Sequence, residues 1–464
     1  MIRTARNALI VWAVITLLIL VELLWIYLRM GRAGFGVFIQ QPPLINLPVT
    51  MASVALLWLS AGVFLLVLQS GRVNRSNLLS VGGFFLVFWV YLNFLSERFR
   101  YGDYTYYYDA AVSMYANQPL PGSYFYLPFW ATLLQFLAPL GLDVFFIVLW
   151  LLNVLAFLLF YILLYRTLQR YEFAPQFAAL ITLLFMLANA PLLRTLVYVQ
   201  VNLHALNLIL LSLLLYPRRS FLSAFALALA VHLKSSPAVL VLAFLFERDW
   251  RWLGWFALSM LAIAGVTVAT DGISPFLDSL NHIQGLALSD NTIFHDTSFD
   301  SFLRFVGPIL GLGATWIRGL VYAAKALLLV ATVAVMLRCL RTSAFTPQNT
   351  QAAPGRGDRM LNALPPLFIL MTLASPVVWE HHGVFVALPF LLMLKRLELP
   401  SDWLWFGFAY LLEFLLPTFD FFPWSFGRLF APLLLLWLMW KTARQASPSP
   451  IFARTNLWLQ QVLQ

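Results

Sequence analysis

Charged residues are scarce in this sequence. Asp, Glu, Lys and Arg make up only 10% of its 464 residues, whereas 62% are hydrophobic and the mean hydropathy is +0.83. A soluble globular domain carries about a quarter charged residues, which cover its surface. The composition therefore excludes an ordinary water-soluble domain and favours a chain whose outer surface faces lipid.

Cysteine is almost absent as well. The single residue of this type, Cys339, excludes an internal disulfide framework and any metal site built from cysteine. Basic residues outnumber acidic ones, giving a net charge of +10. They fall mainly between apolar segments, so membrane topology explains them and no nucleic-acid partner is expected.

Long apolar runs stand where polar surface is missing. A helix needs about 20 apolar residues to cross a bilayer. The first run, 8–28, is longer than the core of a signal peptide and has no small-residue cleavage site after it, so it is expected to span. The sequence predicts an all-α polytopic membrane protein with about 12–14 transmembrane helices. The predicted spans are 8–28, 47–68, 78–95, 142–165, 177–196, 203–216, 221–233, 237–246, 252–269, 317–337, 361–374, 383–394, 403–416 and 429–440.

Lysine and arginine in the short loops set the orientation of these spans. With the N-terminus in the cytoplasm, nearly every inside loop is basic, and the C-terminal tail is cytoplasmic too. The pattern holds only if the stretch 126–140, which Pro128 and Pro139 interrupt, does not cross the membrane. We therefore expect a multi-pass protein of the cell membrane with both termini in the cytoplasm.

The first long outside loop contains two aspartates among tyrosines, Asp103 and Asp109. Interfacial aromatic residues are ordinary membrane anchors, and Asp103 could be a plain helix N-cap. The alternative is catalytic, because a carboxylate beside apolar rings has a raised pKa and can serve as a general base. Both interpretations remain open at this stage.

Gln200 and Asn202 open a predicted span from the outside. Polar side chains entering a membrane need partners, which are either neighbouring helices or a ligand. Residues two apart diverge by roughly 200° on a helix, so these two can face one ligand only where the helix is unwound.

Lys234 lies between two short apolar segments, and Pro237 breaks the chain just after it. A lysine at the centre of a span costs about 2.5–3.5 kcal/mol on insertion. Such a cation suits an anionic ligand, although a lysine that snorkels to the interface is the alternative. Arg304, at the end of the second outside loop, could hold a phosphate bidentately or pair with Asp300 four residues earlier.

The densest polar cluster on the outside is Trp379-Glu380-His381-His382. Neighbouring helical residues point about 100° apart, so one histidine at most is expected to face a given substrate atom. Zinc binding would require a third ligand from elsewhere, such as His282 or His295. We expect no metal here.

Taken in order, these segments resemble family 87 glycosyltransferases of the GT-C superfamily. The chain departs from that pattern in having two spans before the one that leads to the aspartate loop, and in a Lys-Ser-Ser-Pro sequence where Lys-Pro is commoner. The matching pieces are 102–111, 126–128, 200–202, 233–237, 298–304 and 375–382.

The resemblance implies a GT-C-type helical bundle whose outside loops carry the active site. It implies a polyprenyl-phosphate-linked donor sugar such as mannose, a glycan or lipid-linked acceptor, transfer on the extracytoplasmic face with inversion, and no cofactor. The superfamily places its catalytic carboxylate in the first large outside loop, where Asp103 stands. The expected site is Asp103 with His381 or His382 as catalytic residues, Lys234 and Arg304 on the donor phosphate, and Tyr107, Tyr126, Gln200, Asn202, Trp379 and Glu380 on substrate.

The domain organisation expected from this resemblance has three parts. Residues 1–96 form N-terminal transmembrane helices, 97–395 the catalytic core with outside loops 97–141 and 271–308, and 396–464 the C-terminal helices and tail. Two other function classes remain open. A transporter or flippase for polyprenyl lipids would also use broken helices, but the sequence has no internal duplication and its polar groups gather on one side. An assembly protein that binds such lipids without chemistry is the third possibility.

Overall fold

The computed structural model describes residues 102–288, 296–342, 344–345, 356–416, 424–443 and 448–462, besides residues 17 and 21. These residues form helices joined by loops, and none of those described lies in a β-strand. The predicted all-α class is therefore confirmed for this part of the chain. The predicted spans 8–28, 47–68 and 78–95 lie outside the described residues, apart from positions 17 and 21.

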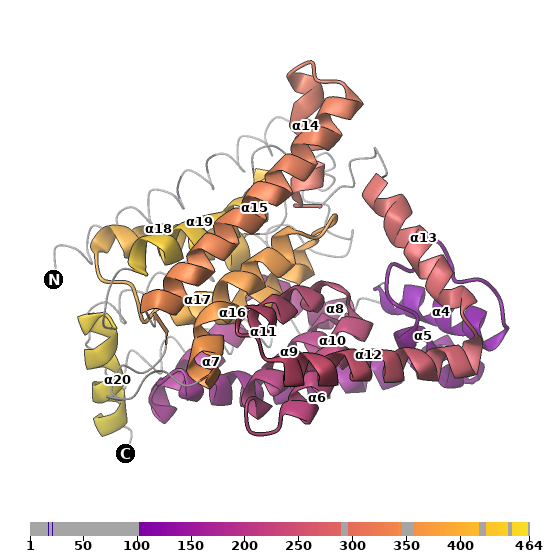
Figure 1. The fold of residues 1–464 in the computed structure, drawn as a ribbon, viewed down its shortest axis with the longest axis horizontal. Coiled ribbons are helices and arrows are strands. Elements are labelled where there is room, and N and C mark those ends of the chain that lie inside the picture. Colours follow the sequence, from indigo (N-terminus) through magenta and orange to yellow (C-terminus); the bar gives the residue numbers. More distant parts are fainter. Residues whose placement is uncertain are drawn as a thin grey trace.

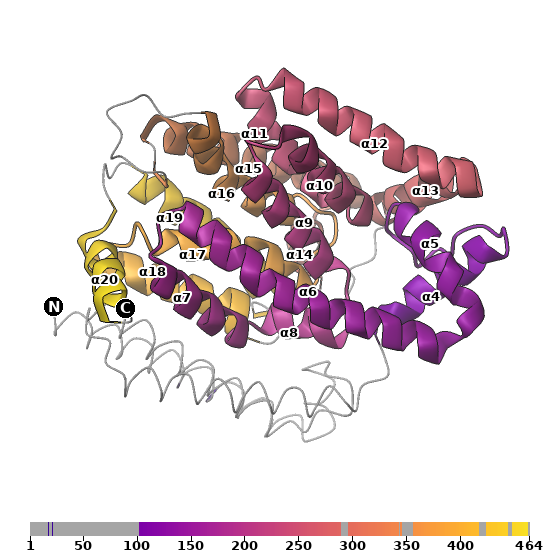
Figure 2. The ribbon, with the colours of Figure 1, turned by 90° about the horizontal axis from the view of Figure 1, so that it is seen from below.

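The helices differ widely in length and type. Figures 1 and 2 show them packed into one bundle, in which the first two and the last lie at opposite ends. In chain order they are α4 (Tyr104–Tyr115), α5 (Phe129–Leu134), η1 (Gln135–Leu140), α6 (Leu142–Arg170), α7 (Pro175–Leu187), α8 (Ala190–Val197), α9 (Asn202–Leu215), α10 (Ser220–Leu233), η2 (Ser236–Leu240), α11 (Val241–Phe246), α12 (Trp250–Asp271), α13 (Ser274–Leu288), α14 (Phe299–Ile309), α15 (Ala314–Thr342), α16 (Arg356–Leu373), η3 (Glu380–Val386), α17 (Ala387–Met393), α18 (Pro400–Tyr410), η4 (Leu411–Leu415), η5 (Trp424–Phe426), α19 (Gly427–Thr442) and α20 (Pro450–Val462).

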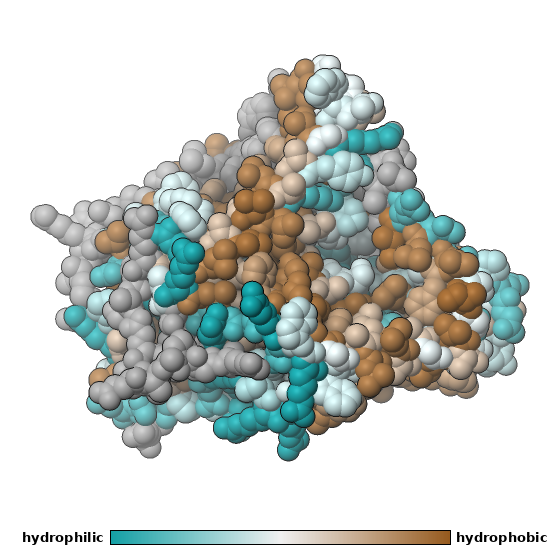
Figure 3. All heavy atoms as spheres, viewed as in Figure 1, coloured by the Kyte–Doolittle hydropathy of each residue, from teal (hydrophilic) through white to brown (hydrophobic). Residues whose placement is uncertain are grey.

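Among the residues that the structure describes, three helices, α6, α12 and α15, are each long and apolar enough to cross a membrane. Each turns large apolar side chains outward: Leu155 on α6 is 61% exposed, Leu261 on α12 is 71% exposed and Leu327 on α15 is 70% exposed. Figure 3 shows hydrophobic side chains spread over α12 and α15. Apolar faces of this extent favour lipid as the surrounding solvent, so the chain is a polytopic membrane protein.

The predicted span 177–196 is not one straight helix. Its residues form α7 and α8, which are bent by 63°. The side-chain oxygen of Asn189 accepts a hydrogen bond from the backbone N–H of Leu192 at 3.0 Å, and Pro191 stands in the first turn of α8. An N-cap side chain and an early proline both favour a new helix start, so the predicted span is broken into two helices at this point.

Several other predicted spans form shorter helices of 10–17 residues. At about 1.5 Å of rise per residue, such helices do not reach across a bilayer alone. The predicted total of about 12–14 spans therefore stays a prediction. The shorter apolar helices are Phe129–Leu140, Asn202–Leu215, Ser220–Leu233, Ser236–Phe246, Arg359–Leu373 and Glu380–Met393.

The stretch 126–140 is one of these short segments and is tied to one end of α12. It forms α5 and then η1, with Pro139 inside the 3-10 turn. The hydroxyl of Thr132 donates to the carboxylate of Asp271 at 2.8 Å, and the amide of Gln135 donates to the same carboxylate at 2.9 Å. A short segment held against the terminus of α12 is consistent with the expectation that this stretch does not cross.

Candidate active site

Asp103 stands at the beginning of α4, where the chain is pressed against the end of α8. Its backbone N–H donates to the carbonyl of Tyr198 at 3.1 Å, and a Cβ at Gly102 would come within 2.9 Å of that same oxygen. The Asp103 side chain makes no capping hydrogen bond to α4. Helix capping, which was the alternative explanation of this carboxylate, is therefore excluded.

The carboxyl group of Asp103 is held close to its titration point. Burial raises its pKa to about 7, and the positive charge of Lys234 opposes that rise. The side chain nevertheless keeps part of its surface accessible. A carboxyl group with these properties can take up a proton near neutral pH, as a general base must.

Tyr107, Tyr126 and Gln200 meet beside Asp103. Tyr107 follows Asp103 by one helical turn, so both lie on the same face of α4. The Gln200 side-chain oxygen accepts from the hydroxyl of Tyr107 at 3.1 Å and from that of Tyr126 at 3.3 Å. The two hydroxyl oxygens are 3.2 Å apart. The structure thus brings together three residues that the sequence predicts on substrate.

A tight turn before α9 makes this arrangement possible. Val199 has a φ of 54°, a left-handed conformation that β-branched residues rarely adopt. Gln200 therefore precedes the helix, and Asn202 begins it. The helix is unwound at this point, which is the condition under which Gln200 and Asn202 can serve one site. Backbone conformations of this kind cluster at functional sites.

Lys234 follows the last residue of α10 and points into the bundle. Its ammonium donates to the side-chain oxygen of Asn202 at 2.6 Å and lies 5.5 Å from the centroid of the Phe385 ring. Asn202 is fully buried. An ammonium that reaches a buried amide does not snorkel toward water. The alternative of a lysine that snorkels to the interface therefore does not describe the geometry of Lys234.

The same amide of Asn202 also binds the segment 379–382, here called the histidine segment. Its nitrogen donates to the carbonyl of His381 at 3.2 Å, and the hydroxyl of Thr195 contacts that carbonyl at 3.4 Å. Lys234 and His381 are therefore joined through one side chain.

The rings of Trp379, His381 and His382 form one cluster. The two imidazole centroids are 4.8 Å apart, and the Trp379 ring lies 5.8 Å from His381 and 5.9 Å from His382. Burial, with Lys234 nearby, lowers the pKa of both imidazoles. They are neutral at physiological pH and offer hydrogen bonds rather than positive charge. The Nε2 atom of His381 is buried and has no hydrogen-bond partner among the described residues.

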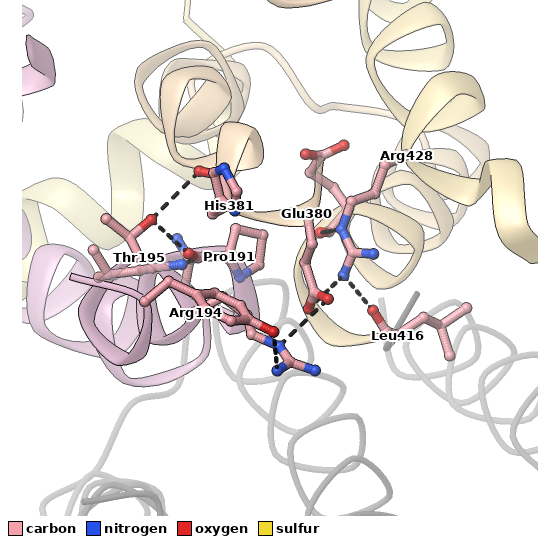
Figure 4. A network of polar contacts seen from close by, with 11 residues as sticks. Pro191, Arg194, Thr195, Glu380, His381, Leu416 and Arg428 are labelled. Atoms are coloured by element: carbon pink, nitrogen blue, oxygen red, sulfur yellow. Dashed lines mark hydrogen bonds and ion pairs between the residues drawn. The ribbon is translucent and has the colours of Figure 1, made fainter. Parts of the chain in front are cut away.

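Glu380 lies between two arginines that the sequence analysis did not single out. Its carboxylate is 3.5 Å from Nε of Arg194 on α8 and 3.2 Å from Nη2 of Arg428 on α19 (Figure 4). Arg428 also donates to the backbone carbonyls of Glu413 and Leu416. Glu380 thus anchors the histidine segment to two helices. The one sequence signal for Arg194 was a charge inside an apolar run.

A comparison with known protein families shows to which family the chain belongs. The family model described as Glycosyltransferase family 87 matches residues 124–376, more than half of the sequence. The chain belongs to glycosyltransferase family 87. It is therefore a membrane glycosyltransferase, as the resemblance implied. No curated protein and no solved structure matches the chain.

The extent of the family 87 match divides the site. The matched stretch includes Tyr126, Gln200, Asn202, Lys234 and Arg304. Asp103, Tyr107 and the cluster 379–382 lie outside it, so their assignment to this glycosyltransferase site rests on the contacts described above.

The surroundings of Arg304 match the second of its two interpretations from the sequence, the pairing with Asp300. It lies on α14, 3.9 Å from a carboxylate oxygen of Asp300, whose other oxygen is 2.5 Å from the ammonium of Lys325 on α15. The alternative that Arg304 pairs with Asp300 is confirmed. Its role on the donor phosphate stays a prediction.

Asp296 was missed by the sequence analysis. It links two loop segments next to the site through hydrogen bonds. Its carboxylate accepts from the backbone N–H of Val378 at 2.8 Å and from the N–H and hydroxyl of Ser298 at 2.9 Å each. The N–H of Thr297 donates to the carbonyl of Val378 at 2.8 Å. The second outside loop is therefore fastened to the residue just before Trp379.

The part of the chain that the structure describes contains no set of side chains suited to bind a metal ion. No three His, Cys, Asp or Glu side chains gather there as metal ligands would. His295, one candidate third ligand, lies outside the described residues. Metal-independent transfer therefore remains an expectation of the sequence analysis.

Proposed function

We propose that this family 87 enzyme transfers a hexose, with mannose as the expected sugar, from a polyprenyl-phosphate-linked donor to a hydroxyl of a glycan or lipid-linked acceptor. Transfer takes place on the extracytoplasmic face of the cell membrane. One observation carries the proposal: the partly accessible carboxyl group of Asp103, whose pKa burial raises to about 7, interacts with the positive charge of Lys234, which Asn202 holds at 2.6 Å. This pairs a general base with a cation at the same site.

Asp103 is the general base of the proposed reaction. Its carboxylate removes the proton of the acceptor hydroxyl while that oxygen forms a bond to the anomeric carbon of the donor sugar. The bond from the anomeric carbon to the phosphate oxygen breaks at the same time. A single displacement of this kind inverts the anomeric centre and leaves the proton on Asp103.

Lys234 stabilises the leaving polyprenyl phosphate, on which negative charge grows in the transition state. His381 or His382, both neutral, can add a hydrogen bond, and Arg304 is the further cation predicted for this phosphate. A monophosphate leaving group neutralised in this way requires neither a metal ion nor a cofactor. Tyr107, Tyr126, Gln200, Asn202, Trp379 and Glu380 are proposed to orient the sugar.

The test is transfer from radiolabelled polyprenyl-phosphate mannose by the purified chain in lipid vesicles. Asp103→Asn keeps the size of the side chain and removes the base, so the rate should fall by about 10²–10⁴-fold. Asp109→Asn is the matched control, because Asp109 is an exposed aspartate on the same helix.

Two results would contradict the proposal. Full activity of the Asp103→Asn variant would remove the proposed base. Movement of the lipid across vesicles that contain the wild-type chain, without any sugar transfer, would favour the transporter instead.

A further inference from the structure

Two buried N–H groups beside the proposed base have no partner among the described residues. These are the indole nitrogen of Trp130, whose side chain is 9% exposed, and the amide nitrogen of Gln200, whose side chain is fully buried. A buried donor left without an acceptor costs about 1–3 kcal/mol. Most buried polar groups in native proteins do have a partner, so two unpaired donors on neighbours of the same residue, Tyr107, point to a ligand.

The Gln200 side chain has a fixed orientation. Its oxygen accepts from the hydroxyls of both Tyr107 and Tyr126, at 3.1 and 3.3 Å. The NH₂ end of the same planar group is therefore turned away from these hydroxyls. This explains why the Gln200 NH₂ group donates no hydrogen bond to the two hydroxyls from which its oxygen accepts.

Trp130 lies against the same cluster. Its ring meets the Tyr107 ring edge to face at 6.4 Å, and it lies 6.1 Å from the imidazole of His204 on α9. His204, Tyr126, Asp103 and Lys234 each keep part of their surface accessible, although they lie among fully buried neighbours. Partly accessible groups surrounded by buried ones are expected where side chains line a recess.

We propose that Trp130, His204 and the Gln200 amide form the subsite that holds the hexosyl group of the donor. The aromatic rings cover an apolar C–H face of the sugar, and the free N–H groups donate to its hydroxyls. The inference rests on the proposed function and names the residues that recognise the sugar, as distinct from the phosphate.

The chemistry of these groups separates a sugar from the other parts of the donor. A polyprenyl tail offers no acceptor, so it would leave both buried donors unpaired. A phosphate is attracted by cations, which here means Lys234, whose ammonium donates to Asn202. A hexose supplies both the hydroxyl acceptors for the N–H groups of Trp130 and Gln200 and an apolar face for the rings of Trp130 and His204.

The test is binding to the full chain in lipid nanodiscs, with two probes: polyprenyl-phosphate mannose and sugar-free polyprenyl phosphate. Trp130→Phe keeps a six-membered aromatic ring and removes the five-membered ring with its N–H. It should weaken binding of the sugar-bearing lipid about three- to ten-fold and leave the sugar-free lipid unchanged. His204→Ala, which removes the ring that would cover the sugar, is the second variant and should have the same selective effect. Trp150→Phe, at a 46% exposed position on α6, is the control.

A deoxy-sugar donor sharpens the assignment. If the Trp130 N–H donates to one sugar hydroxyl, the wild type should bind the donor lacking that hydroxyl as weakly as Trp130→Phe does, and the two changes together should cost no more than either alone. Equal binding of the two lipids by the wild type, or equal weakening of both by the variants, would overturn the subsite. Selective binding without transfer would instead contradict the proposed reaction and leave the subsite standing.

Discussion

The ammonium of Lys234 and the backbone carbonyl of His381 are bound by opposite ends of one amide, that of Asn202. The oxygen of Asn202 lies 2.6 Å from the Lys234 nitrogen, and its nitrogen lies 3.2 Å from the His381 carbonyl. Three segments far apart in the sequence are therefore placed by one uncharged side chain. A buried network of this kind is effective only when every member is satisfied.

Replacing Asn202 by leucine should separate this cation from the histidine segment. The side-chain volume is nearly kept, but both partners lose a hydrogen bond. We expect kcat at saturating donor and acceptor to fall by about ten- to a hundred-fold, since one unsatisfied buried polar partner costs about 1–3 kcal/mol. Asn207→Leu is the control: Asn207 is buried on the same helix and donates to the carbonyl of Ala156 at 2.7 Å. That variant should lose stability and keep its rate. Equal kinetic losses in the two variants would argue against a special role for Asn202.

The pH dependence of transfer should report Asp103. The base acts only when deprotonated, so kcat/KM should rise as the pH approaches about 7, the pKa of this carboxyl. Burial lowers the pKa of Lys234 to about 7 as well, so the rate should fall again at higher pH, where this cation loses its proton. Lys234→Met removes the charge that opposes the rise in this pKa, and should move the acid limb to higher pH as well as lower the maximum. The control is Lys441→Met. Lys441 lies on α19 and pairs with Asp402 at 2.6 Å, so its loss should leave the acid limb where it is. A limb that does not move in Lys234→Met would show that the two groups do not interact.

The same shift affects the stability of the fold. The pKa of Asp103 is raised from 3.8 to about 7, so the folded state binds its proton more tightly than the unfolded state. The stability linked to that proton is complete below pH 3.8 and is lost as the pH rises through about 7. Asp103→Asn does not titrate. Its Tm, measured in detergent, should therefore exceed that of the wild type increasingly from pH 4 to pH 7 and by a constant amount above pH 8. A difference independent of pH would contradict this assignment.

The sequence was informative where local chemistry determines the structure. The apolar runs predicted most helices of the described region, although not α4, α13, α14 or α20, which lie in the predicted outside loops and tail. The polar residues within the runs predicted a single site, because a charge or amide in an apolar setting requires a partner. Lys234, Asn202 and Gln200 were identified in this way.

The remaining features depend on contacts between distant segments, which local patterns do not encode. The bend between α7 and α8 had a local signal in Asn189 and Pro191, but Arg194 became relevant only because that bend brings it to Glu380. Asp296 looked like any loop aspartate until the fold placed it against Val378.

Glu380 offers a test of whether a residue near the site acts on the sugar or holds the site together. Its carboxylate is shared by Arg194 and Arg428, at 3.5 and 3.2 Å, and its side chain is 12% exposed. Glu380→Gln leaves two guanidinium groups without their shared charge, so we expect a loss of about 1–3 kcal/mol in the free energy of unfolding. We also expect a lower kcat with little change in KM for the donor, because the segment carrying His381 would be less well fixed.

The matched control for Glu380 is Glu172→Gln. Glu172 is 40% exposed and lies 3.5 Å from the ammonium of Lys395. That ammonium is buried but also donates to the carbonyls of Tyr171 and Phe345, so it keeps hydrogen-bond partners in Glu172→Gln and the loss of stability should be smaller. Thermal unfolding and steady-state kinetics of the two variants should be measured together. An increase in KM for the donor in Glu380→Gln at unchanged stability would instead place its carboxylate on the sugar. That result would return Glu380 to the substrate-binding role expected from its sequence motif.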